Sequence, residues 1–524
     1  MLKLSLIVSL MCSTSFLTAN QESRPPNVLL IIADDLRASL GCYGHRFIQT
    51  PYLDSLAVRS VRFTTSASQI AVCAPSRTSF LTSRRPDTLR LYSNKGAFYW
   101  RTKVGNFTTI PQLFKEAGYF TASAGKVFHP GESSGETYDY PYSWSVPHYE
   151  PPTEKHKDDK VCRHADGSLH RDIVCPVDVP SQPGGSLPDI QTTQYAINLL
   201  RQLANQPHDA SKPFFLAIGF HKPHIPLKFP RQYLELYPLD SIPSVPDPHL
   251  PLDLPSVAYE PWSDIRERED ISWLNLSFPY EPIPGYYALK IRQSYYAAVS
   301  YMDGLVGQVL AALDVNGFKE NTVIVFLGDH GWALGEHNEW AKYSNFRVTT
   351  NVPLIVHAPG VTMTTSDAGM VSNGLVELVD LMPTLAEVCG LSVPDRCPDD
   401  SSKVTVCTEG LSFYPLLKNP SRPWKKAVFS QYPRPSQIPG DNSCQPLPKD
   451  ISIMGYSLQT AQGRYSEWVR FDPVLSRANL SEVLAREFYL SPREDINVAA
   501  IPLYARLVQE LSVLLRKGWR GALP

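Results

Sequence analysis

The sequence predicts an α/β fold with a large, mainly parallel central sheet flanked by helices, and three observations support this prediction. Apolar runs of strand length alternate with helical patterns along the chain, which is the order that parallel sheets require. The first run, Asn27–Ala33, is continuously apolar and β-branched, as is typical of a strand buried on both faces. Polar residues directly follow four of these runs. Because ligands bind outside the carboxyl ends of such strands, the sequence predicts a binding site there.

The individual elements follow from the same patterns. The predicted strands of the sheet are residues 27–33, 119–124, 214–220 and 322–327, and the predicted helices are residues 50–60, 110–117, 191–203 and 291–313. From about Ser412 the pattern changes to short strands at 427–430, 452–460, 466–471 and 487–490 and a helix at 502–517. This change predicts a smaller C-terminal α+β subdomain with an antiparallel sheet. We therefore expect a large α/β domain over residues 20–411 and the subdomain over residues 412–524.

Two further intervals, residues 130–188 and 237–284, are long and rich in proline and aromatic residues. Loops of this length in a compact protein usually shape a binding site. We therefore expect both intervals to shape a binding site.

The amino-terminal sequence predicts the cellular compartment of the protein. Residues 1–19 have the features of a cleaved signal peptide, with Lys3 before an apolar run. No later stretch is long and apolar enough to span a bilayer, so we expect a protein of the secretory pathway without a membrane anchor. The sequons at Asn106, Asn275 and Asn479 are candidate glycosylation sites. The formal net charge of −2 gives no general attraction to polyanions, so we expect no nucleic-acid partner, and local basic groups must hold any anionic substrate.

The chain has nine cysteines, and a secreted protein is expected to pair most of them. Cys12 lies in the signal peptide and Cys73 lies in the motif described next. Each of two further pairs brackets a polar loop and is a predicted disulfide: Cys162 with Cys175, and Cys397 with Cys407. The pairing of Cys42, Cys389 and Cys444 is left open.

Residues 72–77 read Val-Cys-Ala-Pro-Ser-Arg and stand before a helix-like run. Considered alone, Cys73 would more often be a buried cysteine before a proline at a helix start. The pattern Cys-x-Pro-Ser-Arg, however, resembles the signature of the sulfatase family, in which this cysteine is oxidised to formylglycine by the formylglycine-generating enzyme. A thiolate that attacked a sulfate ester would leave an adduct with no route to release. A hydrated aldehyde carries two hydroxyls, so that one can attack sulfur and the other can then expel sulfate.

Three carboxylates are candidates for a metal site. Asp34 and Asp35 follow the first predicted strand, and Asp329 with His330 follows the run at 322–327. An isolated Asp-Asp pair is more often a helix cap, but three carboxylates at strand ends would repel one another without a cation. Oxygen ligands favour Ca²⁺ or Mg²⁺, whereas His330 suits softer metals. The resemblance implies one Ca²⁺ held by these four residues and by the modified Cys73, in an alkaline-phosphatase-like sulfatase fold.

The resemblance also implies catalytic roles for several basic residues. Alone, a Lys-His pair, a histidine beside a proline or a single lysine is more often structural or on the surface. In the family pattern, Arg77, Lys126 and Lys342 neutralise the sulfate. His221 or Lys342 would protonate the leaving alkoxide, and His129 would take the proton of the second hydroxyl.

Four segments resemble a particular branch of the sulfatase family. They are residues 29–37, 221–226, 329–337 and 430–435. That branch removes the 2-sulfate from terminal iduronate in heparan sulfate and dermatan sulfate, in lysosomes. The substrate carboxylate would need its own cation, for which Arg37, Arg101 and Lys449 are candidates, while Trp332 and Tyr343 could pack on the sugar ring. The loop at 441–445 lacks the lysine that the family places against this carboxylate.

Two other classes of protein compete with this interpretation. An alkaline-phosphatase-like phosphodiesterase would need a serine or threonine nucleophile and ligands for a second metal, yet Cys73 stands at the nucleophile position, and Lys126 and Lys342 stand where that metal would bind. A non-catalytic glycosaminoglycan-binding glycoprotein would be expected to lose motif residues, and the core set is complete. A sulfatase with another glycosaminoglycan substrate is a third alternative.

Overall fold

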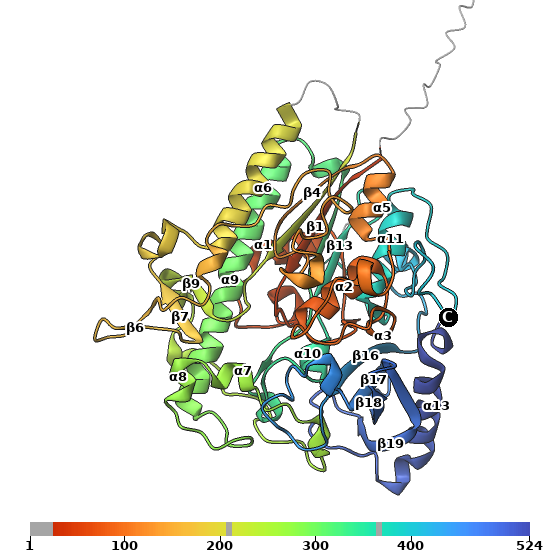
Figure 1. Ribbon diagram of the computed structural model, residues 1–524. Helices are drawn as coiled ribbons and strands as arrows, with labels where there is room; N and C mark the ends of the chain where they lie inside the picture. The colour runs from red at the N-terminus through yellow and green to blue at the C-terminus, as the bar shows by residue number, and fades with distance from the viewer. Residues whose placement is uncertain (1–24, 206–211, 363–368) are drawn as a thin grey trace, which may run out of the picture.

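The computed structural model describes residues 25–205, 212–362 and 369–524, so the predicted signal peptide lies outside the described residues. A seven-stranded mixed sheet forms the centre of the protein (Figure 1). Its strands, in spatial order, are β14 (Met370–Ser372), β2 (Val61–Phe63), β13 (Leu354–His357), β10 (Thr322–Gly328), β1 (Asn27–Ala33), β8 (Phe214–Phe220) and β4 (Phe120–Gly125).

The four strands predicted from the sequence form one continuous parallel half of this sheet. β1 pairs in parallel with both β10 and β8, and β8 pairs in parallel with β4. The other half was not predicted: β13 runs antiparallel to β10 and β2, and β14 is parallel to β2. These strands have only three or four residues each, too few for a periodic pattern. The predicted mainly parallel sheet is confirmed.

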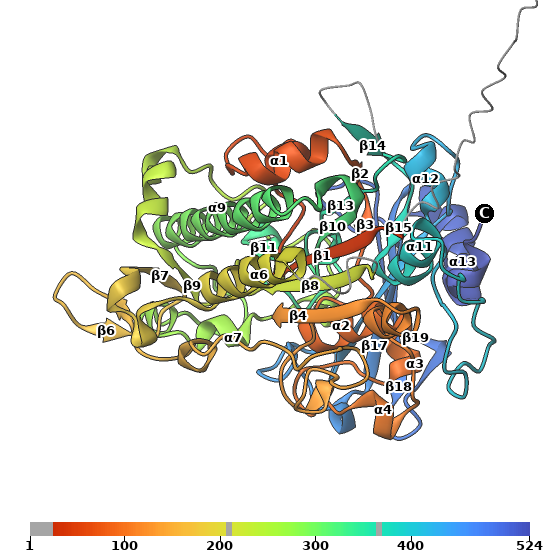
Figure 2. The same cartoon turned by 90° about the horizontal axis from the view of Figure 1, so that it is seen from above.

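Both faces of β1 are buried, because alternate residues point to opposite sides of a strand. Leu29, Ile31 and Ala33 belong to a core cluster with α9 (Gly285–Val315), α6 (Pro188–Asn205) and α1 (Pro51–Val58). Val28, Leu30 and Ile32 belong to a second cluster with α2 (Cys73–Thr82), α5 (Ile110–Glu116) and α11 (Leu381–Val388). Figure 2 shows the first group of helices on one side of the sheet and α2 and α11 on the other.

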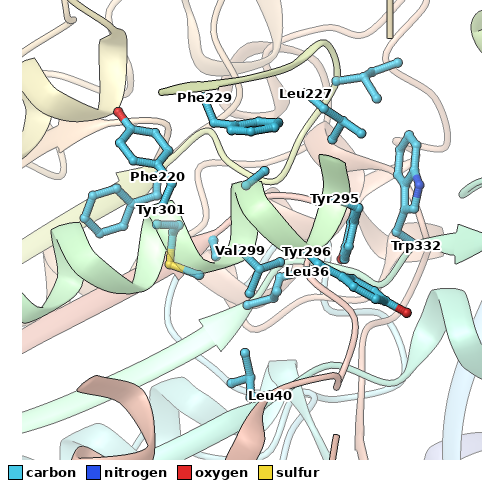
Figure 3. Close-up of a cluster of buried hydrophobic side chains, with 14 of the residues drawn as sticks. Leu36, Leu40, Phe220, Leu227, Phe229, Tyr295, Tyr296, Val299, Tyr301 and Trp332 are labelled. Atoms are coloured by element: carbon cyan, nitrogen blue, oxygen red, sulfur yellow. The ribbon is translucent and has the colours of Figure 1, made fainter. Parts of the chain in front are cut away.

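The long helix α9 anchors the first of these clusters. Its Tyr295, Tyr296 and Val299 lie among Phe220, the last residue of β8, and Leu36 and Trp332, which follow β1 and β10 (Figure 3). By length and composition α9 could cross a membrane, but 67% of its most apolar window is buried inside the protein. It is therefore the core helix of a folded domain.

The C-terminal part of the chain forms a separate four-stranded antiparallel sheet, as predicted. The order is β16 (Val428–Arg434), β17 (Ile453–Thr460), β18 (Gly463–Asp472) and β19 (Arg477–Tyr489). The final helix, α13 (Ala505–Gly521), packs Leu511 and Leu515 against this sheet. The sheet is joined to the catalytic part near the site, since Gln431 N donates to the carbonyl oxygen of Gln69 at 2.9 Å.

The structure contains both predicted disulfides, Cys162–Cys175 and Cys397–Cys407. Cys42, Cys389 and Cys444 are free thiols, which answers the open question of their pairing. The three sequon asparagines are exposed, as a glycan would require.

Candidate active site

The ends of the four parallel strands bring the predicted site residues together. Ala33, the last residue of β1, is level with Gly328 of β10 and Phe220 of β8, and Gly125 of β4 is level with Gly219. The residues that follow are Asp34 and Asp35, Asp329 and His330, His221 to His224, and Lys126. Parallel strands thus place, at one edge of the sheet, side chains that lie almost 300 residues apart in the chain.

Helix α2 places Cys73, the predicted nucleophile, at this edge of the sheet. Cys73 is its first residue, and all ten of its residues are buried. Ser76 Oγ donates to the carbonyl oxygen of Asp329 at 2.5 Å, and Arg77 Nε donates to Asp329 Oδ2 at 2.8 Å. The serine and arginine of the motif therefore lock the start of the helix onto the end of β10.

Four charged or polar groups surround the Cys73 sulfur. Its Sγ lies 3.1 Å from Lys342 Nζ, 3.3 Å from Asp34 Oδ1, 3.4 Å from His330 Nε2 and 3.8 Å from Lys126 Nζ. Burial raises the pKa of this thiol, and the charge of Asp34 adds to the effect. An unmodified Cys73 would therefore be a protonated thiol and a poor nucleophile.

The carboxylates around Cys73 have the composition of a metal site. Ligand atoms of Asp34, Cys73, Asp329 and His330 all lie within 4.8 Å of one another, and a second group contains Asp34, Asp35, Cys73 and His224. Asp35 Oδ2 is buried and has no hydrogen-bond partner. Burial raises the pKa of Asp35 to about 8, so its ionisation calls for an added cation. A hard divalent cation fits this oxygen-rich donor set.

Three cations stand around the same carboxylates. Arg77 Nη2 lies 3.6 Å from Asp34 Oδ1, Lys126 forms an ion pair with Asp34, and Lys342 Nζ lies 2.6 Å from Asp35 Oδ1. Burial opposes the charge of both lysines, but the neighbouring carboxylates outweigh it and raise the pKa of Lys126 and Lys342. Both lysines are therefore protonated and can receive an anion.

A cavity of about 410 Å³ opens onto this group of residues. Of the predicted site residues, Lys126, His129, Lys342 and Tyr343 line it. The lining residues that the sequence did not single out are Asn94, Lys95, Pro130, Glu154, Lys157, Asp158, Arg171, His224, Ile225, Asp264, Glu267, Arg268 and Gln445. Most of them come from the two long intervals, 130–188 and 237–284, which border the site as expected.

The two histidines of the His-Lys-Pro-His segment have different surroundings. His221 does not line this cavity: its Nδ1 lies 3.0 Å from Asp189 Oδ1 and its Nε2 lies 3.3 Å from Glu154 Oε2. His224 does line it, with Nε2 3.9 Å from Asp35 Oδ2. Burial and the charge of Lys126 lower the pKa of both His224 and His129, so both rings are neutral. The structure therefore places His224, rather than His221, near Asp35 and in the lining of this cavity.

Four of the predicted substrate-binding residues, Arg37, Arg101, Trp332 and Lys449, do not line this cavity. Arg37 Nη1 donates to Glu336 Oε1 at 2.9 Å, and Arg101 Nε donates to Asp139 Oδ1 at 2.6 Å. Trp332 is fully buried, with its ring centroid 5.7 Å from Lys342 Nζ, so it supports the lysine. Lys449 is exposed.

The fold and the site define a class: hydrolases of the alkaline-phosphatase-like α/β fold, with a buried cysteine at a helix start beside residues that could hold a metal ion. The Sulfatase family model matches residues 26–391. The chain is 50% identical to proteins named iduronate 2-sulfatase from Mus musculus, over 95% of each chain, and from Homo sapiens, over 95% of this chain and 96% of that one. The protein therefore belongs to the sulfatase family and is a sulfuric ester hydrolase. A solved phosphonate monoester hydrolase from Silicibacter pomeroyi has the same fold, with a TM-score of 0.69 at 23% identity, covering 95% of this chain and 96% of that one.

Proposed function

We propose that this sulfatase removes the 2-sulfate ester from iduronate at the non-reducing ends of heparan sulfate and dermatan sulfate, in lysosomes. The observation that carries the proposal is the 50% identity over 95% of the chain to two proteins named iduronate 2-sulfatase. The arrangement of Lys126, Lys342 and three carboxylates about Cys73 supports the reaction type.

The nucleophile in this proposal is formylglycine made from Cys73 by the formylglycine-generating enzyme in the secretory pathway. The complete Cys-x-Pro-Ser-Arg motif supports it, as does the raised pKa of the buried thiol. The hydrated aldehyde supplies two hydroxyls on one carbon, one to attack sulfur and one to expel sulfate.

The metal in this proposal is one Ca²⁺ held by Asp34, Asp35, Asp329, His330 and residue 73. The buried and unbonded Asp35 Oδ2 supports a cation at this position, and the three carboxylates favour a hard one. Bound there, the ion would neutralise negative charge on the sulfate oxygens.

The remaining steps belong to side chains of this chain. Lys126 and Lys342, both charged, lie 3.8 and 3.1 Å from the sulfur of residue 73 and hold the sulfate, while Arg77 fixes the carboxylate of Asp329. Lys342, which is charged, is placed to deliver a proton to the leaving oxygen, and His224, whose ring is neutral, can donate a hydrogen bond to it. His129 is neutral and lines the cavity, so its ring can accept the proton released when sulfate leaves.

Hydrolysis of defined disaccharides tests the proposal. The enzyme should desulfate a disaccharide with a non-reducing iduronate 2-sulfate far faster than one with glucosamine 6-sulfate. If the rates on the two disaccharides were comparable, the enzyme would be a sulfatase whose preferred glycosaminoglycan substrate is a different one. Activity on phosphodiesters with two bound metal ions would favour the phosphodiesterase alternative.

A further inference from the structure

The cavity mouth carries four basic side chains besides those around Cys73: Lys95, Lys157, Arg171 and Arg268. Two of them are paired, since Lys157 Nζ lies 3.8 Å from Glu154 Oε1 and Arg268 Nη1 lies 3.1 Å from Asp158 Oδ1. Lys95 and Arg171 have no side-chain hydrogen bond or ion pair with any residue in the described part of the chain. An unpaired cation facing a substrate cavity is available to an anionic group of the substrate.

The surroundings of these two cations differ. Arg171 is bound through its backbone to Glu269, since its N–H donates to Glu269 Oε2 at 3.3 Å and its carbonyl oxygen accepts from Glu269 N at 3.2 Å. An acidic side chain thus stands beside Arg171, and the exposed Glu267 also lines the cavity. Neither of the chain neighbours of Lys95, Asn94 and Gly96, carries a charge.

The turn that carries Lys95 is held firmly on two sides. Asn94 Oδ1 accepts a hydrogen bond at 2.9 Å from the backbone N–H of Ala74, the residue after Cys73. On the other side, Gly96 has a φ of 66° and packs so closely on the C-terminal subdomain that a Cβ would lie 2.9 Å from Pro448 Cδ. The backbone of Lys95 is thus fixed relative to residue 73, while its exposed side chain can reach into the cavity.

The wall next to this turn supplies no cation of its own. Gln445, three residues before Pro448, lines the cavity as a neutral amide, and its Nε2 donates to Tyr343 Oη at 2.9 Å. Tyr343 in turn donates to Asp264 Oδ2 at 2.8 Å. Lys449 is exposed and does not line the cavity. A substrate anion on this side of the site therefore has Lys95 as its cation.

We propose that Lys95 binds the carboxylate of the sugar that carries the sulfate, and so makes the enzyme selective for a sulfated uronate. This inference rests on the proposed function. The sulfate occupies Lys126 and Lys342 at the base of the cavity, and the carboxylate of the same ring is a second anion for which the cavity must provide a donor. A charge-assisted hydrogen bond from Lys95 supplies it and leaves the neutral analogue without a partner.

The test is a comparison of two substrates across five enzymes. The substrates are an iduronate 2-sulfate disaccharide and its carboxyl-reduced analogue, and the quantity compared is the ratio of their kcat/KM values. The enzymes are the wild type, Lys95→Ala, Lys95→Arg and Lys449→Ala, with Lys103→Ala as a control for removal of an exposed lysine charge. Lys95→Ala should lower the ratio about tenfold or more, and Lys95→Arg should retain most of it. Lys449→Ala and Lys103→Ala should keep the wild-type ratio.

The possible outcomes separate the inference from the proposed function. A wild-type enzyme that cleaves both substrates equally would overturn the proposed uronate selectivity, and this inference with it. If the wild-type enzyme prefers the uronate substrate and Lys95→Ala keeps the same ratio of kcat/KM values, the role of Lys95 is wrong but the proposed function stands. If Lys449→Ala lowered the ratio of kcat/KM values and Lys95→Ala did not, Lys449 rather than Lys95 would be the residue that binds the carboxylate. Lys95 lies in an exposed turn, so a thermal melt on each variant suffices to show that it folds.

Discussion

Asp189 holds His221 through both its backbone and its ring. Asp189 Oδ1 accepts a hydrogen bond from His221 N at 2.7 Å and lies 3.0 Å from His221 Nδ1, while Asp189 Oδ2 accepts one from Lys222 N at 2.9 Å. This buried carboxylate fixes the start of the loop after β8. The loop then turns His224, three residues on, toward Asp35 and the cavity.

The first prediction separates the two histidines. His224→Gln should lower kcat about 100-fold on a sugar sulfate, and much less on an activated aryl sulfate whose leaving group needs no protonation. His221→Gln keeps an amide that can still donate to Asp189, so its smaller loss should be equal on both substrates. Steady-state kinetics on the two substrates decides this. If His221→Gln showed the leaving-group dependence instead, His221 would be the histidine that acts on the leaving oxygen.

The second prediction concerns Asp189 as a positioning residue. Asp189→Asn replaces one acceptor oxygen by an NH₂ group that cannot accept the backbone hydrogen bonds of the loop, so kcat on a sugar sulfate should fall about tenfold. The loss should carry the same leaving-group dependence as His224→Gln, which a merely structural defect would not show. Asp166→Asn, at an exposed loop position, is the matched control and should behave as wild type. An equal loss on both substrates would reject the positioning role.

The parallel half of the sheet could be predicted because β1, β8 and β10 are continuous apolar runs of seven residues. The convergence of Asp34, Asp329 and Lys126 followed from that topology, since strand ends meet at one edge. Short strands such as β2 and β13 could not be predicted, because pairing with neighbours rather than local pattern makes them strands.

The sequence could not show which histidine lies near Asp35 or which cations are free to bind substrate, and the reason is different. Whether His221 or His224 faces the site depends on Asp189, 32 residues away from His221 in the chain. Arg101, beside Trp100, looked available for substrate but is bound by Asp139, 38 residues further on. Lys95 faces the cavity only because its turn is held between α2 and Pro448. Such contacts between distant segments leave no local signal.

The third prediction concerns Cys73. The peptide that contains residue 73 should have the mass of the aldehyde rather than the thiol when the protein is made in cells with the modifying enzyme. Cys73→Ala should abolish turnover while the thermal melting temperature stays close to that of wild type. Mass spectrometry of the tryptic peptide measures the conversion. Full activity with an unmodified thiol would contradict the proposed nucleophile.

The fourth prediction concerns the metal. One Ca²⁺ per chain should be found by elemental analysis, and its removal should abolish activity and lower the melting temperature, because Asp34, Asp35 and Asp329 would be left without their cation. Added Ca²⁺ should restore both properties. Two zinc ions per chain would instead favour the phosphodiesterase alternative.

The last prediction concerns the joint between the catalytic part and the C-terminal subdomain. Glu377 accepts hydrogen bonds from both terminal nitrogens of Arg85, at 2.8 and 2.9 Å, from Lys425 Nζ at 2.8 Å and from the backbone N–H of Phe429 in β16 at 3.0 Å. Burial works against the charge of this carboxylate, but Arg85 and Lys425 outweigh it and lower the pKa of Glu377 to about 2.

The pKa of Glu377 in the folded protein thus lies below the ordinary value of 4.5. Its ionised form therefore stabilises the fold above about pH 4.5, and this contribution is lost as the pH falls toward 2. Glu377→Gln should lower the free energy of unfolding by about 3 kcal/mol at pH 7 and by clearly less at pH 3, because it breaks a buried ion pair that acid already weakens. Urea denaturation at both pH values measures the difference, and Glu510→Gln, in an exposed pair with Arg506, should change little at either. A loss for Glu377→Gln that is the same at pH 3 and pH 7 would mean that its charge does not hold the two parts together.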